Sequence, residues 1–141
     1  MAIDINGVAQ ELIRAFETGQ PLEAPLTSRP GFDLETAYRV GAVLTAHRRA
    51  KGHRTVGYKV AFGNEAIWKK FNLQTVAWSP MYDDTVVSAE ASQGKVPVVF
   101  APKVEPEIVF KLKAPLPATV GSAVEALRYV EWYSLGYEIV D

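Results

Sequence analysis

The sequence contains no cysteine, and this absence excludes several kinds of site together. Without thiols the chain cannot form disulfides, thiolate zinc centres or cysteine nucleophiles. It also lacks a Gly-x-Ser-x-Gly motif and a phosphate-binding Gly-x-Gly-x-x-Gly motif, which argues against a serine hydrolase and a dinucleotide site. Any chemistry of this chain must therefore depend on its other polar side chains, chiefly its carboxylates and amines.

Long apolar runs and an excess of one charge are missing as well. No segment approaches the roughly 18 consecutive apolar residues of a membrane span, and "MAIDINGVAQ" (1–10) lacks the apolar core of a signal peptide. The 15 lysines and arginines nearly balance the 16 aspartates and glutamates, so no overall field recruits nucleic acid or an anionic membrane. These absences predict a cytoplasmic protein with no nucleic-acid or membrane partner.

Apolar residues recur with helical spacing in the first part of the chain. One such stripe consists of Ile5, Val8, Ala9, Leu12, Ile13 and Phe16. The stripe predicts an amphipathic helix that ends at Gly19. Asp33 is a candidate N-cap for a second helix, which we expect to extend to Gly52. A short strand over 55–62 and a third helix over 65–71 are expected to follow.

The later part of the chain is richer in strand-forming residues. "VPVVFAPKVEPEIVFKL" (96–112) contains two strand-like runs interrupted by prolines. Ser122 and Glu125 match a capping box, which predicts a helix over 123–129. A last strand-like run, "VEWYSLGYEIVD", occupies 130–141.

These elements predict the α+β class, with N-terminal helices packed on a mixed β-sheet. We expect a single domain over 1–141, helical over 1–72 and strand-rich over 73–141. No segment follows the last strand-like run to pair with it. We therefore expect the sheet to be incomplete and the domain to be the N-terminal portion of a larger fold.

Glu105 and Glu107 lie two positions apart in a predicted strand, so their side chains point to the same face. At ~4 Å and an effective dielectric constant of about 20, two such carboxylates repel each other by about 4 kcal/mol. Solvent, a shared proton, a basic partner or a cation must offset this repulsion. Solvent is the simplest explanation, because Pro106 favours an edge strand with one wet face.

A third carboxylate, Glu138, lies in another strand-like run, where Gly136 leaves space for a close approach. Three carboxylate oxygens, with positions left open for water and a bidentate ligand, suit Mg²⁺ or Mn²⁺. Spacing by itself is weak support for a metal site, since many strands contain a glutamate.

Three stretches of the sequence resemble the 2-keto-4-pentenoate hydratase family, which with the related 4-oxalocrotonate decarboxylases belongs to the fumarylacetoacetate hydrolase superfamily. They are "TSRPGFDLETAYRVGAVLTAHRRAKGHRTVGYKVAF" (27–62), "PVVFAPKVEPEIVFKL" (97–112) and "VEWYSLGYEIVD" (130–141). The resemblance extends from about Ala15 to Asp141. It implies a sheet of the fumarylacetoacetate hydrolase type and assembly into a homo-oligomer.

The resemblance also implies a metal-dependent site. In the family, the acidic residues of a Glu-x-Glu motif and of a later strand bind the divalent metal, which implies that Glu105, Glu107 and Glu138 bind Mg²⁺ or Mn²⁺. A lysine in a Gly-[Phe/Tyr]-Lys strand lies near the family's active site and is matched by Lys59 in "VGYKVAF" (56–62). Lys59 is thus a candidate catalytic residue that neutralises the substrate carboxylate or moves a proton.

The implied reaction is the addition of water to short 2-hydroxydienoic acids, or their 2-oxo tautomers, in the catabolism of aromatic compounds. Three alternatives stay open at this point. The chain could act as a 2-oxo acid decarboxylase, as a C–C hydrolase of the same superfamily, or as a non-catalytic remnant or partner subunit.

One family feature is missing. The hydratases carry an acidic residue in a Pro-Asp-Tyr-Gly-like turn, with a proposed role in proton transfer. In "WSPMYDDTVV" (78–87), Met81 stands at that position when the sequences are aligned on Pro80. Asp83 and Asp84 follow out of register, so the sequence does not identify the general base.

A basic segment, "AHRRAKGHR" (46–54), includes His47 and His53. Cations at a helix C-terminus interact favourably with the helix dipole, which explains the segment without a ligand. A nucleic-acid surface would need interleaved aromatic residues and a broader basic patch. We therefore expect a solvated helix end here, and no metal site at the histidines.

Overall fold

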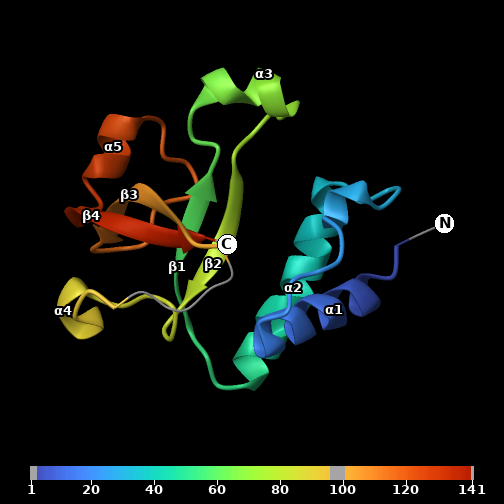
Figure 1. Ribbon diagram of the computed structural model, residues 1–141. Coiled ribbons are helices and arrows are strands. Elements are labelled where there is room, and N and C mark those ends of the chain that lie inside the picture. Colours follow the sequence, from blue (N-terminus) through green and yellow to red (C-terminus); the bar gives the residue numbers. More distant parts are fainter. Residues whose placement is uncertain (1–2, 96–100, 141) are drawn as a thin grey trace. The chain divides into compact units, whose positions relative to one another are not determined.

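The computed structural model describes residues 3–95 and 101–140, which form helices and two two-stranded sheets (Figure 1). The chain divides into two compact units, residues 1–95 and 96–141. The predicted α+β class is confirmed. The mixed sheet is wrong for the described strands, because both sheets are antiparallel and each strand pairs with its neighbour in the sequence.

Helix α1 (Ile5–Thr18) begins and ends at the residues that the sequence indicates. The Asp4 carboxylate accepts a hydrogen bond from the Gly7 N–H at 3.0 Å, as an N-cap residue does. Gly19 ends the helix in the left-handed conformation, with φ +66°. The buried members of the predicted stripe are Val8, Ala9 and Ile13. This prediction is confirmed.

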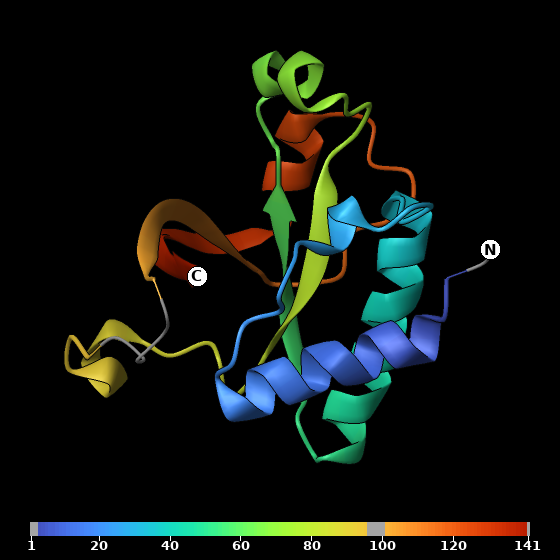
Figure 2. The same ribbon diagram turned by 45° about the vertical axis from the view of Figure 1, so that its right-hand side comes forward.

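Helix α2 (Leu34–Ala50) packs on α1, which lies across it in Figure 2. Asp33 caps it, accepting a hydrogen bond from the Thr36 N–H at 2.8 Å. Val40 of α2 is buried against Val8 and Ala9 of α1. The second helix is thus confirmed, and the contact between the two helices forms the buried core of the first unit.

Strand β1 (Thr55–Ala61) pairs antiparallel with β2 (Ala77–Tyr82). Helix α2 is tied to β2 at Trp78, whose backbone N–H donates to the Tyr38 hydroxyl at 3.2 Å. The rings of these two residues also lie 5.3 Å apart. Further along β2, the Tyr82 hydroxyl donates to the Thr45 hydroxyl of α2 at 3.1 Å, and Arg48 of α2 lies over the Tyr82 ring. Several contacts along β2 therefore fix the β1–β2 sheet to α2.

Short helical segments complete the first unit. The expected third helix is split into a 3₁₀ turn (Glu65–Ile67) and the four-residue α3 (Trp68–Phe71). The remaining segments are a 3₁₀ turn over Leu26–Ser28 and the four-residue α4 over Ala89–Ser92. Among the helices of the described residues, none is long and apolar enough to span a bilayer.

The second unit consists of β3 (Lys103–Leu112), α5 (Ala123–Leu127) and β4 (Val130–Val140). The capping box is confirmed, since the Ser122 hydroxyl accepts a hydrogen bond from the Glu125 N–H at 3.2 Å. Strands β3 and β4 pair antiparallel over nearly their whole length. The first expected strand-like run includes residues 96–100, which lie outside the described residues.

The β3–β4 ribbon has two faces of different chemistry, because successive side chains of a strand alternate between its faces. We call one the acidic face; its cross-strand pairs are Glu105–Glu138, Glu107–Gly136, Val109–Ser134 and Lys111–Trp132. We call the other the apolar face; its pairs are Val104–Ile139, Pro106–Tyr137, Ile108–Leu135 and Phe110–Tyr133.

Candidate metal centre

The pairing of β3 with β4 brings together the three glutamates that the sequence singles out. Glu105 lies directly opposite Glu138, and Glu107 is two residues further along the same face of β3. One carboxylate oxygen from each residue lies within 4.8 Å of the other two. The acidic face therefore presents three converging carboxylates from two strands.

This arrangement is unfavourable for a sheet on its own. Like charges directly opposite one another on paired strands are destabilising. Within residues 3–95 and 101–140, no lysine or arginine forms an ion pair with Glu105 or Glu107. Both side chains are exposed, so water screens part of the repulsion. Glu105 and Glu107 thus hold negative charge that a cation would neutralise.

Gly136 lies on the acidic face as the cross-strand partner of Glu107. A Cβ atom added at Gly136 would lie 2.6 Å from Cγ2 of Val109. Such a contact is far inside the van der Waals distance, so a side chain here would displace Val109 or the strand. The close approach expected at Gly136 is thus made by a neighbouring side chain of β3.

The donor set fits a hard divalent cation. Carboxylate oxygens are the ligands that Mg²⁺, Ca²⁺ and Mn²⁺ prefer. Octahedral Mg²⁺, with bonds of 2.0–2.1 Å, places adjacent ligand oxygens about 2.9 Å apart and opposite ones about 4.2 Å apart. The oxygens of the three glutamates lie up to 4.8 Å apart. Small rotations of these long side chains would bring them to that spacing.

Lys59, the candidate catalytic residue, lies on β1 opposite Ser79 and is half-buried. It belongs to the first unit, whereas the three glutamates belong to the second. Its catalytic role stays a prediction. Met81 lies on β2 opposite Gly57, and its thioether carries no proton to transfer.

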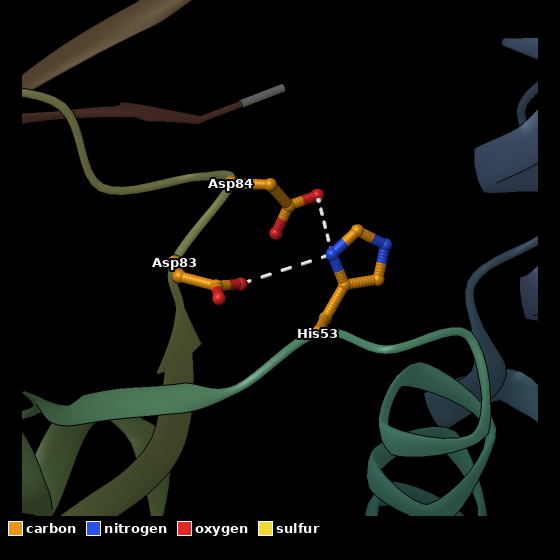
Figure 3. Close-up of side chains that lie close together, drawn as sticks. All are labelled: His53, Asp83 and Asp84. Atoms are coloured by element: carbon orange, nitrogen blue, oxygen red, sulfur yellow. Dashed lines mark ion pairs between the residues drawn. The ribbon is translucent and has the colours of Figure 1, made fainter.

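A second cluster, which the sequence did not reveal, joins His53 to Asp83 and Asp84 (Figure 3). Nδ1 of His53 lies 3.8 Å from an Asp83 oxygen and 3.5 Å from an Asp84 oxygen. These residues lie next to the paired ends of β1 and β2. The pairing of those strands is the signal that would have found the cluster, and it is not visible in the sequence.

Arginines already neutralise both aspartates of this cluster. The Asp83 carboxylate accepts hydrogen bonds from the backbone N–H of Arg54 at 3.1 Å and from its Nε at 3.0 Å. These bonds hold the pKa of Asp83 below its usual value. Arg48 forms an ion pair with Asp84. Two guanidinium groups thus balance two carboxylates, and the cluster links the end of α2 to the β1–β2 sheet.

Comparisons with known proteins point to one group of enzymes, although no family model matches the sequence. A 2-keto-4-pentenoate hydratase from Paraburkholderia xenovorans is 26% identical over 132 residues, which are 94% of this chain and 49% of the relative. A 4-oxalocrotonate decarboxylase from a Pseudomonas species is 30% identical over 137 residues, or 97% and 52% of the two chains. A 2-hydroxyhexa-2,4-dienoate hydratase from Comamonas testosteroni is 28% identical over 139 residues, with the same coverage.

The fold matches solved structures of the same group. The 4-oxalocrotonate decarboxylase from Pseudomonas putida G7, complexed with magnesium and adipate, superposes with a TM-score of 0.77 at 19% identity. Its complex with calcium and acetate gives a TM-score of 0.78. Both matches cover 97% of this chain and 52% of the solved chain.

The chain therefore spans about half the length of the curated relatives it matches. Over nearly all of its own length it is similar to them in sequence, and to the decarboxylase in fold. The resemblance to the 2-keto-4-pentenoate hydratases and the related 4-oxalocrotonate decarboxylases is thereby confirmed.

Proposed function

We propose that this chain carries the metal centre of a hydratase-type lyase that adds water to short 2-hydroxydienoic acids or their 2-oxo tautomers. The observation that carries the proposal is the convergence of Glu105, Glu107 and Glu138 on one face of the β3–β4 ribbon. The names of several relatives, hydratases of 2-keto-4-pentenoate and of 2-hydroxydienoates, support this substrate class.

The three glutamates would hold the cation through one oxygen each, leaving the other coordination positions to water and to a ligand. A divalent cation at this place supplies Lewis-acid polarisation of a carbonyl oxygen. Gly136 contributes no side chain of its own opposite Glu107, and the Val109 side chain packs over it. Lys59 is proposed to balance the charge of the substrate carboxylate or to move a proton.

Metal binding is tested without any turnover. Mn²⁺ titrated into the chain should lose its free-ion electron paramagnetic resonance signal, and Mg²⁺ should compete with it. Glu107→Gln removes one of three ligands. It should weaken binding by more than about 100-fold, because even the loss of an outer-shell partner typically costs 10–100-fold.

Glu131→Gln is the matched control. Glu131 is a glutamate of β4, the strand paired with that of Glu107, but it forms an ion pair with Lys111 at 3.6 Å and lies outside the group of three. Its substitution should leave Mn²⁺ affinity unchanged. Equal affinities of the Glu107→Gln and Glu131→Gln variants would contradict the metal centre.

Turnover is tested by the ultraviolet absorbance of 2-hydroxypenta-2,4-dienoate, which falls when water adds to the conjugated system. The absorbance should fall only with Mg²⁺ or Mn²⁺ present. Lys59→Ala should slow the loss while leaving Mn²⁺ binding intact, and Lys69→Ala, at an exposed lysine of α3, should change neither. Metal binding without turnover would instead favour the non-catalytic alternative.

Decarboxylation is a second candidate reaction, favoured by the 30% identity to a 4-oxalocrotonate decarboxylase. The two reactions differ in their products. Hydration incorporates oxygen from solvent, so H₂¹⁸O labels the product, whereas decarboxylation of 4-oxalocrotonate releases CO₂. The C–C hydrolase alternative predicts two carbon fragments from one substrate. Cytoplasmic location remains a prediction.

A further inference from the structure

Four positions of the acidic face form two adjacent cross-strand pairs in the β3–β4 ribbon (orange and red in Figure 1): Glu105–Glu138 and Glu107–Gly136. Three of these positions carry carboxylates, and the fourth is a glycine. The next residue of β3 on this face is Val109, because side chains of a strand return to the same face at every second residue. Val109 therefore lies on the side of Glu107 that faces away from Glu105.

The side chain of Val109 leans along the ribbon towards the glutamates. Its direct cross-strand partner is Ser134, and Gly136 is its diagonal neighbour on β4. Diagonal neighbours are usually about 7–8 Å apart. Nevertheless, Cγ2 of Val109 lies 2.6 Å from the place that a Cβ atom at Gly136 would occupy, and Cβ of Glu107 lies 4.0 Å from the same place. One methyl group of Val109 thus fills the fourth position, next to Glu107.

We propose that Val109 is a positioning residue of the metal centre. Its methyl group keeps the Glu107 carboxylate close to the other two carboxylates before any cation is bound. Repulsion from Glu105 pushes the Glu107 carboxylate along the strand, towards Val109. A β-branched side chain has few alternative rotamers, so the valine yields little to this push. The inference rests on the proposed function, because it concerns a ligand of the proposed cation.

Confinement of Glu107 lowers the cost of binding a cation. A long side chain such as glutamate loses rotamer freedom when it becomes a ligand, and this loss opposes binding. A neighbour that already excludes unproductive rotamers reduces the loss, as preorganisation does in general. The exposure of the valine agrees with this role. Val109 is 38% exposed, whereas its strand neighbours Ile108 and Phe110 are 63% and 52% exposed, so Val109 packs more closely against its own face.

Mn²⁺ titration followed by electron paramagnetic resonance tests the positioning role. Val109→Ala removes the methyl groups and should weaken Mn²⁺ binding by about 10-fold or more, because groups that orient a metal ligand typically account for about 10–100-fold. Val109→Thr keeps the branched shape and should keep most of the affinity. Val104→Ala is the matched control, since it removes the same groups from the apolar face of β3. It should leave the affinity unchanged, and equal losses in Val104→Ala and Val109→Ala would overturn the proposal.

A second substitution should compensate for the first. In Gly136→Ala the added Cβ atom collides with Cγ2 of Val109. In the double variant Val109→Ala/Gly136→Ala, Cγ2 is absent and the new Cβ atom takes its place beside Glu107. The double variant should therefore bind Mn²⁺ more tightly than Val109→Ala or Gly136→Ala, and it also serves if Val109→Ala fails to fold. Losses that simply add in the double variant would contradict the proposal, because residues that share one space are coupled.

A measurement without metal separates this inference from the proposed function. Glu107→Gln removes the repulsion and should raise the urea midpoint of the metal-free chain at low salt, where the repulsion is least screened. In the Val109→Ala background Glu107 can already move away, so the same substitution should raise the midpoint less. Equal shifts in the two backgrounds would overturn the positioning role. Unequal shifts support it, and if the unaltered chain then binds no Mn²⁺, only the proposed cation is contradicted.

Discussion

At the scale of single residues, the His53–Asp83–Asp84 cluster and the Glu105–Glu107–Glu138 cluster differ in how their carboxylates are neutralised. Arg54 neutralises Asp83 and Arg48 neutralises Asp84, because the fold of the first unit brings these pairs together. In the described residues, neither Glu105 nor Glu107 has an arginine or lysine as an ion-pair partner. Proximity of acidic side chains therefore does not by itself distinguish a candidate metal centre from a structural cluster, and the basic partners of each carboxylate must be compared as well.

Gly136→Ala is expected to destabilise the second unit. The added Cβ atom would lie 2.6 Å from Cγ2 of Val109, and a β-branched side chain has few alternative rotamers with which to avoid it. We expect a loss of about 1–3 kcal/mol, the usual cost of overpacking. Denaturant unfolding measures this loss of stability. If β4 moves away from β3, Mn²⁺ binding should weaken as well.

Gly41→Ala is the matched control for this substitution. Gly41 lies inside α2, where an added Cβ atom meets nothing within 4 Å. Alanine stabilises a helix interior relative to glycine by about 0.8–1.0 kcal/mol, so this variant should gain stability. Equal effects of the two substitutions would show that steric contact at Gly136 is unimportant.

At the scale of secondary-structure elements, the cap of α2 makes the stability of the first unit depend on pH. Hydrogen bonds with the side chain and backbone N–H of Thr36 hold the pKa of Asp33 below its usual value. The carboxylate therefore stabilises the folded state above the unfolded pKa of about 3.9. That contribution is lost as pH falls through the lower, folded-state pKa. Urea unfolding of the first unit at several acidic pH values measures this loss.

Asp33→Asn separates the cap from the charge, because asparagine is an equally good N-cap but does not titrate. This variant should keep most of the stability at neutral pH and lose part of its dependence on acid. Asp33→Ala should lose stability at neutral pH as well. Identical pH profiles for Asp33→Asn and the unaltered chain would exclude the cap as the titrating group.

The elements that the sequence predicts well are those fixed by local contacts. Asp33 begins α2 and Gly19 ends α1 through hydrogen bonds or backbone angles within a few residues. Strand pairing is not local. The pairing of β1 with β2 across the intervening helical segment was not predicted.

The same distinction applies to the candidate sites. Glu105 and Glu107 share a face because of the two-residue repeat of a strand, which the sequence contains. That Glu138 joins them depends on the register of β3 with β4, which its place in a strand-like run suggested only weakly and the family resemblance implied. The His53 cluster needed the β1–β2 pairing and had no such resemblance to indicate it. Predictability therefore fell as the contacts became less local.

At the scale of the whole molecule, the two units differ in how they are stabilised. The buried apolar residues of the described chain are Val8, Ala9, Ile13 and Val40, all of the first unit. The ribbon of the second unit has like charges paired on one face and exposed apolar residues on the other. Binding of a cation to the acidic face would therefore stabilise the second unit.

This difference predicts where a bound cation protects the backbone. Ligand at about 100 times its dissociation constant adds about 2.7 kcal/mol to the stability of the state that binds it. Hydrogen exchange that requires the binding site to open is then slowed about 100-fold. With saturating Mg²⁺ we expect this protection in β3 and β4, and none in α1 and α2. Glu107→Gln should remove this protection of β3 and β4.

If the chain instead opens as the single domain expected from its sequence, the slowest-exchanging amides of α1 and α2 will be protected equally, because one global opening then exposes both units. Unchanged exchange throughout would show that the three glutamates bind no cation.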